Sequence, residues 1–61
     1  MLYLERELHE SIVIQCAGRM IRLRVNHIHG RRVWLGFDAP DDVRIDREEV
    51  YEAKRRAAGE V

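Results

Sequence analysis

The sequence predicts a small, mainly β domain with one C-terminal α-helix. Apolar and polar residues alternate in several short runs, which is the period of half-buried strands. Turn-forming residues separate these runs, and the spacing becomes helical near the C-terminus. We expect one domain over residues 1–61, with five short strands within about residues 1–46 and a helix over about residues 47–58.

A chain of 61 residues has a marginal core, because it buries only about 60% of its unfolded surface. Its single cysteine, Cys16, has no partner for an intramolecular disulfide. A metal or a partner subunit is the usual remaining support for so small a core. Five strands and one helix fit a homodimer best, since alone they cover too little apolar surface.

The first half of the chain predicts three strands. Leucines alternate with polar residues in residues 2–8, which predicts a half-buried strand. A turn at His9–Glu10 leads into a short apolar run at Ser11–Ile14. Residues 15–18 are expected to form a loop ending in a glycine that tolerates positive φ. The clearest two-residue period follows at residues 21–25, where aliphatic residues alternate with arginines.

The second half of the chain predicts a hairpin and a short fifth strand. Residues 27–31 contain turn-forming residues, so the strand at residues 33–37 is expected to return beside residues 21–25. Pro40 prevents that strand from continuing, because it donates no backbone hydrogen bond. Alternation resumes at residues 43–46, which predicts the last strand.

The predicted helix follows that strand directly. Asp46 and Glu49 have the spacing of a capping box, and carboxylates in the first turn are favoured by the helix dipole. Apolar residues recur at helical spacing between Val50 and Ala57, and Gly59 is a plausible stop.

The net charge of zero hides a segregated pattern. Residues 19–32 contain arginines and no carboxylate, whereas residues 38–52 contain seven carboxylates against Arg44 and Arg47. Segregated charge can attract a polyanion to one face, although solvated strand faces and turns explain the same pattern. The candidate auxiliary contacts for nucleic acid are Arg19, Arg22, Arg24, Arg31 and Arg32.

Two groups of residues carry a family pattern. They are Met1-Leu2-Tyr3-Leu4, Arg6 and Glu10-Ser11-Ile12-Val13-Ile14 near the start, and Gly36, Ala39-Pro40, Val43, Ile45 and Arg47-Glu48-Glu49-Val50-Tyr51 near the end. Together they resemble the carbon storage regulator family, CsrA and its RsmA-type relatives, over about residues 1–56. The family comprises small dimeric RNA-binding proteins that regulate translation. The resemblance implies five strands and one helix in an interlocked homodimer, in which first and last strands pair with their counterparts from the other subunit.

The resemblance also implies an RNA site between the first strand of one subunit and the last strand of the other. Such a site recognises GGA in hairpin loops of messenger leaders, and small regulatory RNAs are further expected partners. Backbone groups can read the edges of unpaired bases there. The residues at the matching positions are Leu4, Arg6, Ala39, Pro40, Ile45, Asp46 and Arg47.

Arg47 is the first candidate among these residues. Its guanidinium can bind phosphate bidentately or stack on a base. A solvated helix start is the simpler interpretation, but a cation at a helix N-terminus opposes the dipole. This favours a functional reason for Arg47.

Several residues depart from the family pattern. Glu5 stands where a neutral residue is usual, Glu7 where a second arginine is usual, and Asp46 where a neutral or basic residue is usual. His9 stands where glycine is usual, and three residues around 15–17 look like an insertion. Losing a phosphate contact at Glu7 reduces the salt dependence of binding by about one counterion. Two alternatives follow: a divergent relative that acts through protein partners or mixed dimers, and a broader binder of single-stranded RNA or DNA.

Other chemistry has weaker support. His27 and His29 lie close in sequence, but zinc needs four ligands at recognised spacings, so hairpin-turn histidines are the simpler interpretation. Trp34 is expected to pack at a dimer contact or beneath the helix rather than serve as a stacking platform. Ser11 is the only Ser or Thr, and no Gly-rich phosphate loop is present. We therefore expect no enzyme, cofactor, metal or membrane span, and a cytoplasmic location.

Overall fold

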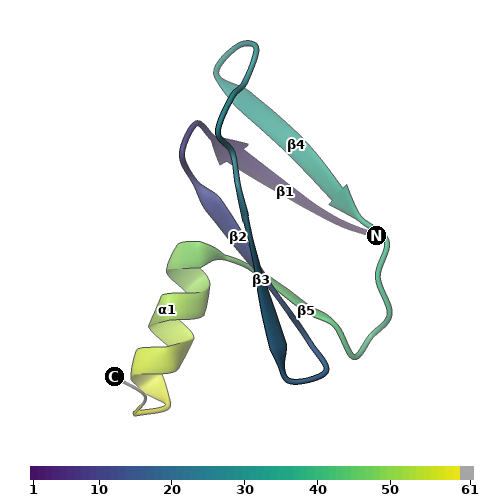
Figure 1. Ribbon diagram of the computed structural model, residues 1–61, viewed down its shortest axis with the longest axis vertical. Helices are drawn as coiled ribbons and strands as arrows, with labels where there is room; N and C mark the ends of the chain where they lie inside the picture. Colours follow the sequence, from purple (N-terminus) through teal and green to yellow (C-terminus); the bar gives the residue numbers. More distant parts are fainter. Residues whose placement is uncertain (60–61) are drawn as a thin grey trace.

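The computed structural model describes residues 1–59 and contains five strands followed by one helix (Figure 1). The elements are β1 (Leu2–Glu7), β2 (Ser11–Cys16), β3 (Arg19–Arg24), β4 (Arg32–Phe37), β5 (Arg44–Arg47) and α1 (Glu48–Ala57). The predicted fold class is confirmed, and the helix lies within one residue of its expected bounds at each end. Residues 60 and 61, which the predicted domain included, lie outside the described residues. No helix in the described part of the chain is long and apolar enough to cross a membrane.

The strands form two antiparallel sheets. β1 pairs with β4 in one sheet, and β2 lies between β3 and β5 in the other (Figure 1). Leu4 lies opposite Leu35 in the first sheet, and Ile14 lies opposite both Ile21 and Ile45 in the second. Because side chains alternate between faces, these pairs give each sheet one mostly apolar face.

The predicted hairpin between residues 21–25 and 33–37 is wrong. β4 pairs with β1 from Leu2 opposite Phe37 to Glu7 opposite Arg32, and the segment between β3 and β4 crosses to the other sheet. Val25 explains this path, because its N–H donates to the Glu10 carbonyl and its own carbonyl accepts from the His9 N–H. These bonds tie the end of β3 to the β1–β2 turn.

The expected loop at residues 15–18 is shorter than predicted. Gln15 and Cys16 belong to β2, where they pair with Met20 and Arg19 of β3. The turn therefore contains only Ala17 and Gly18, both with positive φ, at 53° and 75°. Two consecutive residues with positive φ are typical of the tight turn that joins antiparallel strands.

The core of the single chain is small. Its buried apolar side chains are Leu4, Ile12, Val13 and Val25, and Ile12 and Val13 are almost inaccessible. Many large apolar side chains stay exposed, namely Met1, Leu2, Tyr3, Leu8, Met20, Ile21, Leu23, Trp34 and Val50. Trp34 is 67% exposed, so the expectation that it packs beneath the helix is wrong, and a dimer contact at Trp34 stays a prediction.

The turn between β1 and β2 holds His9 in a conformation that favours glycine. The φ of His9 is 70°, and the Glu10 N–H donates to the Glu7 carbonyl at 3.0 Å, which confirms the predicted turn. A non-glycine residue in this region is strained by about 1 kcal/mol, because its Cβ approaches the following carbonyl.

We therefore expect His9→Gly to raise the free energy of unfolding by up to about 1 kcal/mol. His29→Gly is the matched control, because His29 is exposed and is not among the residues with positive φ. That control should lower the free energy of unfolding by about 0.5 kcal/mol through the greater freedom of the unfolded chain. Urea denaturation of the three proteins tests this, and equal losses in both variants would contradict it.

Candidate nucleic-acid interface

Arg6 ties the first strand to the start of the helix. The residue is only 5% exposed, and its Nη1 and Nη2 donate to the two carboxylate oxygens of Glu49 at 3.0 and 2.8 Å. Nη1 also donates to the Ser11 carbonyl and Nε to the Glu5 carbonyl. Four of the five N–H donors of a guanidinium are thus used within the protein. A two-pronged arginine–carboxylate pair is among the stronger polar contacts in proteins.

The two partners of this ion pair shift each other's pKa and differ in their exposure to solvent. Hydrogen bonds from Arg6 lower the pKa of Glu49 to about 2, and those bonds raise the pKa of Arg6. The side chain of Glu49 is 60% exposed whereas that of Arg6 is buried. Removing Glu49 would therefore leave a buried cation without its main partner, which is the more costly of the two possible losses.

The junction between β5 and α1 differs from the predicted capping box. The residue before the helix is Arg47, and no side chain caps the helix start. Asp46 stays in β5 because it pairs with Val13 of β2, and its carboxylate accepts a hydrogen bond from Lys54 Nζ at 3.1 Å. The Glu49 carboxylate is engaged by Arg6 and by its own backbone N–H, so it does not complete a capping box with Asp46. The predicted carboxylates in the first turn, Glu48 and Glu49, are confirmed.

Arg47 lies at this junction, and its guanidinium has no hydrogen-bond or ion-pair partner within residues 1–59. It lies opposite Ile12 in the β2–β5 pairing and is half-buried. Within residues 1–59 its side chain makes no hydrogen bond or ion pair, although its charge contributes to the low pKa of Glu49. Strand pairing thus fixes the backbone of Arg47, and its guanidinium is available to bind an external anion.

Ala39, Pro40 and Ile45 lie together around a shallow hollow of about 320 Å³. Its other lining residues are Met1, Leu2, Phe37, Asp38, Asp41 and Val43. The hollow joins the start of β1 to the segment between β4 and β5. It is lined by apolar side chains and two carboxylates, so any contact with nucleic acid here would use backbone groups and apolar packing rather than charge.

The seven predicted site residues therefore form several groups in one chain. Ala39, Pro40 and Ile45 line the hollow, and Arg47 lies further along β5 on the same face as Ile45. Leu4 is buried, as is Arg6, and Asp46 lies on the opposite face of β5 with Lys54. The structure does not bring the seven together into one cleft.

The five auxiliary arginines differ in their partners. Arg22 Nε lies 2.9 Å from Glu48, and Arg32 lies 3.6 and 3.9 Å from Glu5 and Glu7. Both arginines are therefore partly neutralised. The other three, Arg19, Arg24 and Arg31, are exposed and form no ion pair within the described residues.

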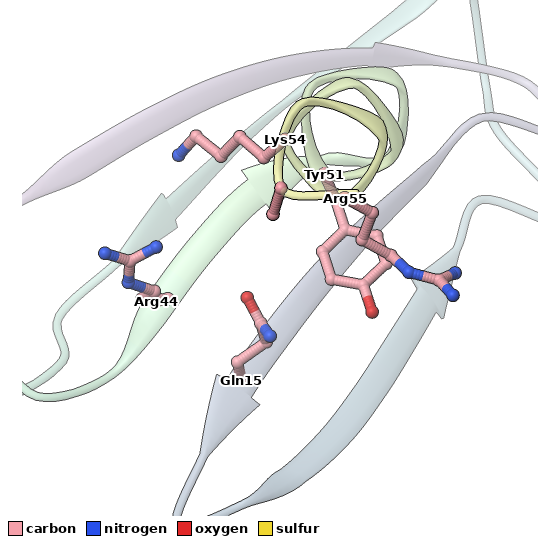
Figure 2. Close-up of a pocket in the computed structure, with 6 residues that line it drawn as sticks. Gln15, Arg44, Tyr51, Lys54 and Arg55 are labelled. Atoms are coloured by element: carbon pink, nitrogen blue, oxygen red, sulfur yellow. The ribbon is translucent and has the colours of Figure 1, made fainter. Parts of the chain in front are cut away.

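A groove between α1 and the β2–β5 pair was missed from the sequence. Figure 2 shows Gln15, Arg44, Tyr51, Lys54 and Arg55 around it, and its volume is about 190 Å³. Two signals were available: Arg44 precedes Asp46 by two residues on one strand face, and Tyr51 precedes Lys54 and Arg55 by the three- and four-residue spacing of one helix face.

The Arg6–Glu49 pair predicts an acid-sensitive contribution to stability. A carboxylate whose pKa is lowered on folding stabilises the protein above its unfolded pKa of about 4.3, and that contribution is lost as the pH falls toward 2. Glu49→Gln should lower the free energy of unfolding by about 2 kcal/mol at neutral pH, and the difference from the parent protein should shrink between pH 4.3 and 2.

Glu52→Gln is the matched control for that measurement. Glu52 lies 3.8 Å from Arg55 on the helix surface, and removing such a pair should cost less than about 0.5 kcal/mol at any pH. Chemical denaturation at several pH values gives the comparison. A pH-independent difference for Glu49→Gln, or equal effects of the two variants, would contradict the role assigned to the Arg6–Glu49 pair.

Comparison with known proteins places this arrangement in a family. The CsrA model, described as the global regulator protein family, matches residues 1–56. Proteins named translational regulator CsrA are 47% identical in Geobacter metallireducens, over 84% of this chain and 62% of theirs, and 44% identical in Geotalea uraniireducens, over 95% and 75%. The one in Rhodopirellula baltica is 45% identical over 92% of this chain and 76% of its own. No solved structure matched. The matched residues include the first and last strands. The chain, which has five strands and a terminal helix, therefore belongs to the CsrA family.

Proposed function

We propose that this chain is a homodimeric, sequence-selective RNA-binding regulator of translation that binds GGA in the unpaired loops of messenger leaders. Membership of the CsrA family supports this, as do relatives named translational regulators. The observation that carries the proposal is Arg47, a half-buried arginine at the β5–α1 junction whose guanidinium has no hydrogen bond or ion pair within residues 1–59. Such a group is suited to phosphate or to the face of an unpaired base.

The predicted residues have different roles in the proposed site. Arg47 contacts a phosphate or a base, and backbone groups near Ala39, Pro40 and Ile45 read the edges of unpaired bases. Arg6 contributes mainly by holding Glu49, because most of its N–H donors are already used. The bound protein would regulate translation by occlusion, because the ribosome cannot reach a messenger leader that the protein covers. Small regulatory RNAs with the same loops would compete for this site.

The apolar side chains and strand edges that a single chain leaves exposed support dimer formation. Nine large apolar side chains among residues 1–59 are exposed, and each sheet of the described chain ends in strands with an unpaired edge. Exchange of β1 and β5 between two chains would keep the β1–β4 and β2–β5 pairings and make them between subunits instead.

The acidic residues of β1 favour a second candidate, action through a protein partner or a mixed dimer. Glu5 and Glu7 lie beside Arg32 and offset its charge. This weakens the positive potential of one auxiliary arginine without removing Arg47. A folded dimer that binds no RNA would support the second candidate over the first.

The mass of the particle in solution tests whether the protein is a dimer. Sedimentation equilibrium should give a particle of twice the 7.2 kDa chain, because burial of exposed apolar side chains favours association. A single-chain mass at micromolar concentrations would contradict the homodimer and, with it, a site shared between subunits.

RNA selectivity is tested with a short hairpin displaying GGA in its loop and a second hairpin displaying CCU. Fluorescence anisotropy at low and high salt should show tight binding to GGA alone. Arg47→Ala should weaken binding by roughly 10- to 100-fold, as expected for one good arginine contact. Arg56→Gln is the charge control, because Arg56 is exposed on α1 and belongs to no proposed contact.

The other outcomes decide between the alternatives. Equal affinity for both hairpins would contradict GGA selectivity and favour general binding of single-stranded nucleic acid. Unchanged affinity in Arg47→Ala would remove Arg47 from the site.

A further inference from the structure

The groove beside α1 contains side chains that the proposed loop site does not use. Its first hollow, of about 190 Å³, is lined by Gln15, Arg44, Tyr51, Lys54, Arg55 and Ala58 (Figure 2). A second hollow of about 400 Å³ shares Gln15, Arg44 and Tyr51 and extends to the β2–β3 turn, where Arg19 lines it. The shared residues make the two hollows one continuous groove along the helix.

The charge of the groove is mostly positive. Among residues 1–59, three cations and no carboxylate line the first hollow, and the second adds Arg19 and one carboxylate, Asp42. Lys54 is engaged by Asp46 at 3.1 Å. Arg44 and Arg19 make no hydrogen bond or ion pair within residues 1–59. These two arginines are therefore the groove's available partners for an external phosphate.

An aromatic platform lies between the two hollows. Tyr51 is half-buried and lines both of them, and the Arg55 guanidinium lies 5.7 Å from the centre of its ring. In Figure 2 the ring of Tyr51 and the amide of Gln15 face the same hollow from α1 and β2. Unpaired bases stack on aromatic rings and on guanidinium planes, and an amide can both donate to and accept from a base edge.

We propose that this groove binds a nucleotide, with its phosphate at Arg44 and its base against Tyr51 and Arg55. Two sources have the same chemistry: an unpaired nucleotide flanking an RNA loop held at Arg47, or a free mononucleotide. Only the first source rests on the proposed function. Arg44 and Arg47 lie about 10 Å apart along β5 but on opposite faces, and β5 has an unpaired edge around which a flanking strand can pass.

The two sources are separated by two titrations. In the first, a GGA hairpin with blunt ends is compared by anisotropy with the same hairpin carrying a few unpaired nucleotides on each side. In the second, adenosine monophosphate and then inorganic phosphate are titrated into ¹⁵N-labelled protein, and amide shifts are followed. Arg44→Gln and Tyr51→Leu are the test variants, and Arg56→Gln is the matched control on the outer helix surface.

If the source is flanking RNA, the unpaired nucleotides should tighten binding about tenfold. Arg44→Gln should abolish that gain and reduce the salt dependence by about one counterion, while the blunt hairpin keeps its affinity. If the source is a free nucleotide, adenosine monophosphate should shift the amides of Gln15, Arg44 and Tyr51 more strongly than phosphate does. Arg56→Gln should behave as the parent protein in both titrations.

The proposal is overturned if the flanks add no affinity and adenosine monophosphate shifts none of the groove amides. It is also overturned if Arg44→Gln changes neither titration. Because Arg44 is exposed, this variant guards against loss of folding in Tyr51→Leu. Failure of the proposed function has a different signature. The blunt GGA hairpin would then not bind at all, while the mononucleotide titration would still report on the groove.

Discussion

The contact between Arg6 and Glu49 is the constraint on which the arrangement of this small chain depends. It joins the first strand to the first turn of the helix, across 43 residues of sequence, and only four apolar side chains of the described residues are buried. Packing alone gives so small a core little power to fix the helix against the sheets. A bidentate pair adds direction as well as energy, because both carboxylate oxygens must meet the planar guanidinium.

That pair also explains the form of the β5–α1 junction. The carboxylate of Glu49 is held by Arg6 and by its own backbone N–H, and Asp46 is held by its pairing with Val13 and by Lys54. The helix therefore starts without a side-chain cap, directly after Arg47. A cation at this position opposes the helix dipole, but the neighbouring carboxylates of Glu48 and Glu49 offset that cost. The junction can thus carry an arginine with an unused guanidinium.

Local periodicity was sufficient to predict the elements but not their partners. Alternation at residues 33–37 identifies a strand, and the same alternation is satisfied whether the strand pairs with β3 or with β1. The choice depends on Val25, whose two backbone bonds to His9 and Glu10 direct the chain to the other sheet. Backbone bonds of this kind leave no mark in the pattern of side chains. The family resemblance supplied candidate residues, but a list of residues does not reveal that Arg6 is already engaged.

The length of β2 shows a second limit of sequence reasoning. Gln15 and Cys16 are polar or small, so their segment resembled a loop, yet both pair within the sheet. The turn that follows places Ala17 at positive φ, where glycine is usual. Extension of β2 is also what brings Gln15 opposite Arg44 and so builds one wall of the groove beside α1. An unremarkable stretch of sequence thus contributes to a surface because of where its backbone pairs.

The backbone of β1 separates its acidic residues from its two residues of the proposed site. Strand alternation places Glu5 and Glu7 on one face of β1, and Leu4 and Arg6 on the other. The two carboxylates lie near Arg32, across the β1–β4 pairing, whereas Arg6 faces the helix start and Arg47 follows β5. The Glu7 carboxylate therefore acts first on the charge of Arg32, on the face of β1 opposite Leu4 and Arg6.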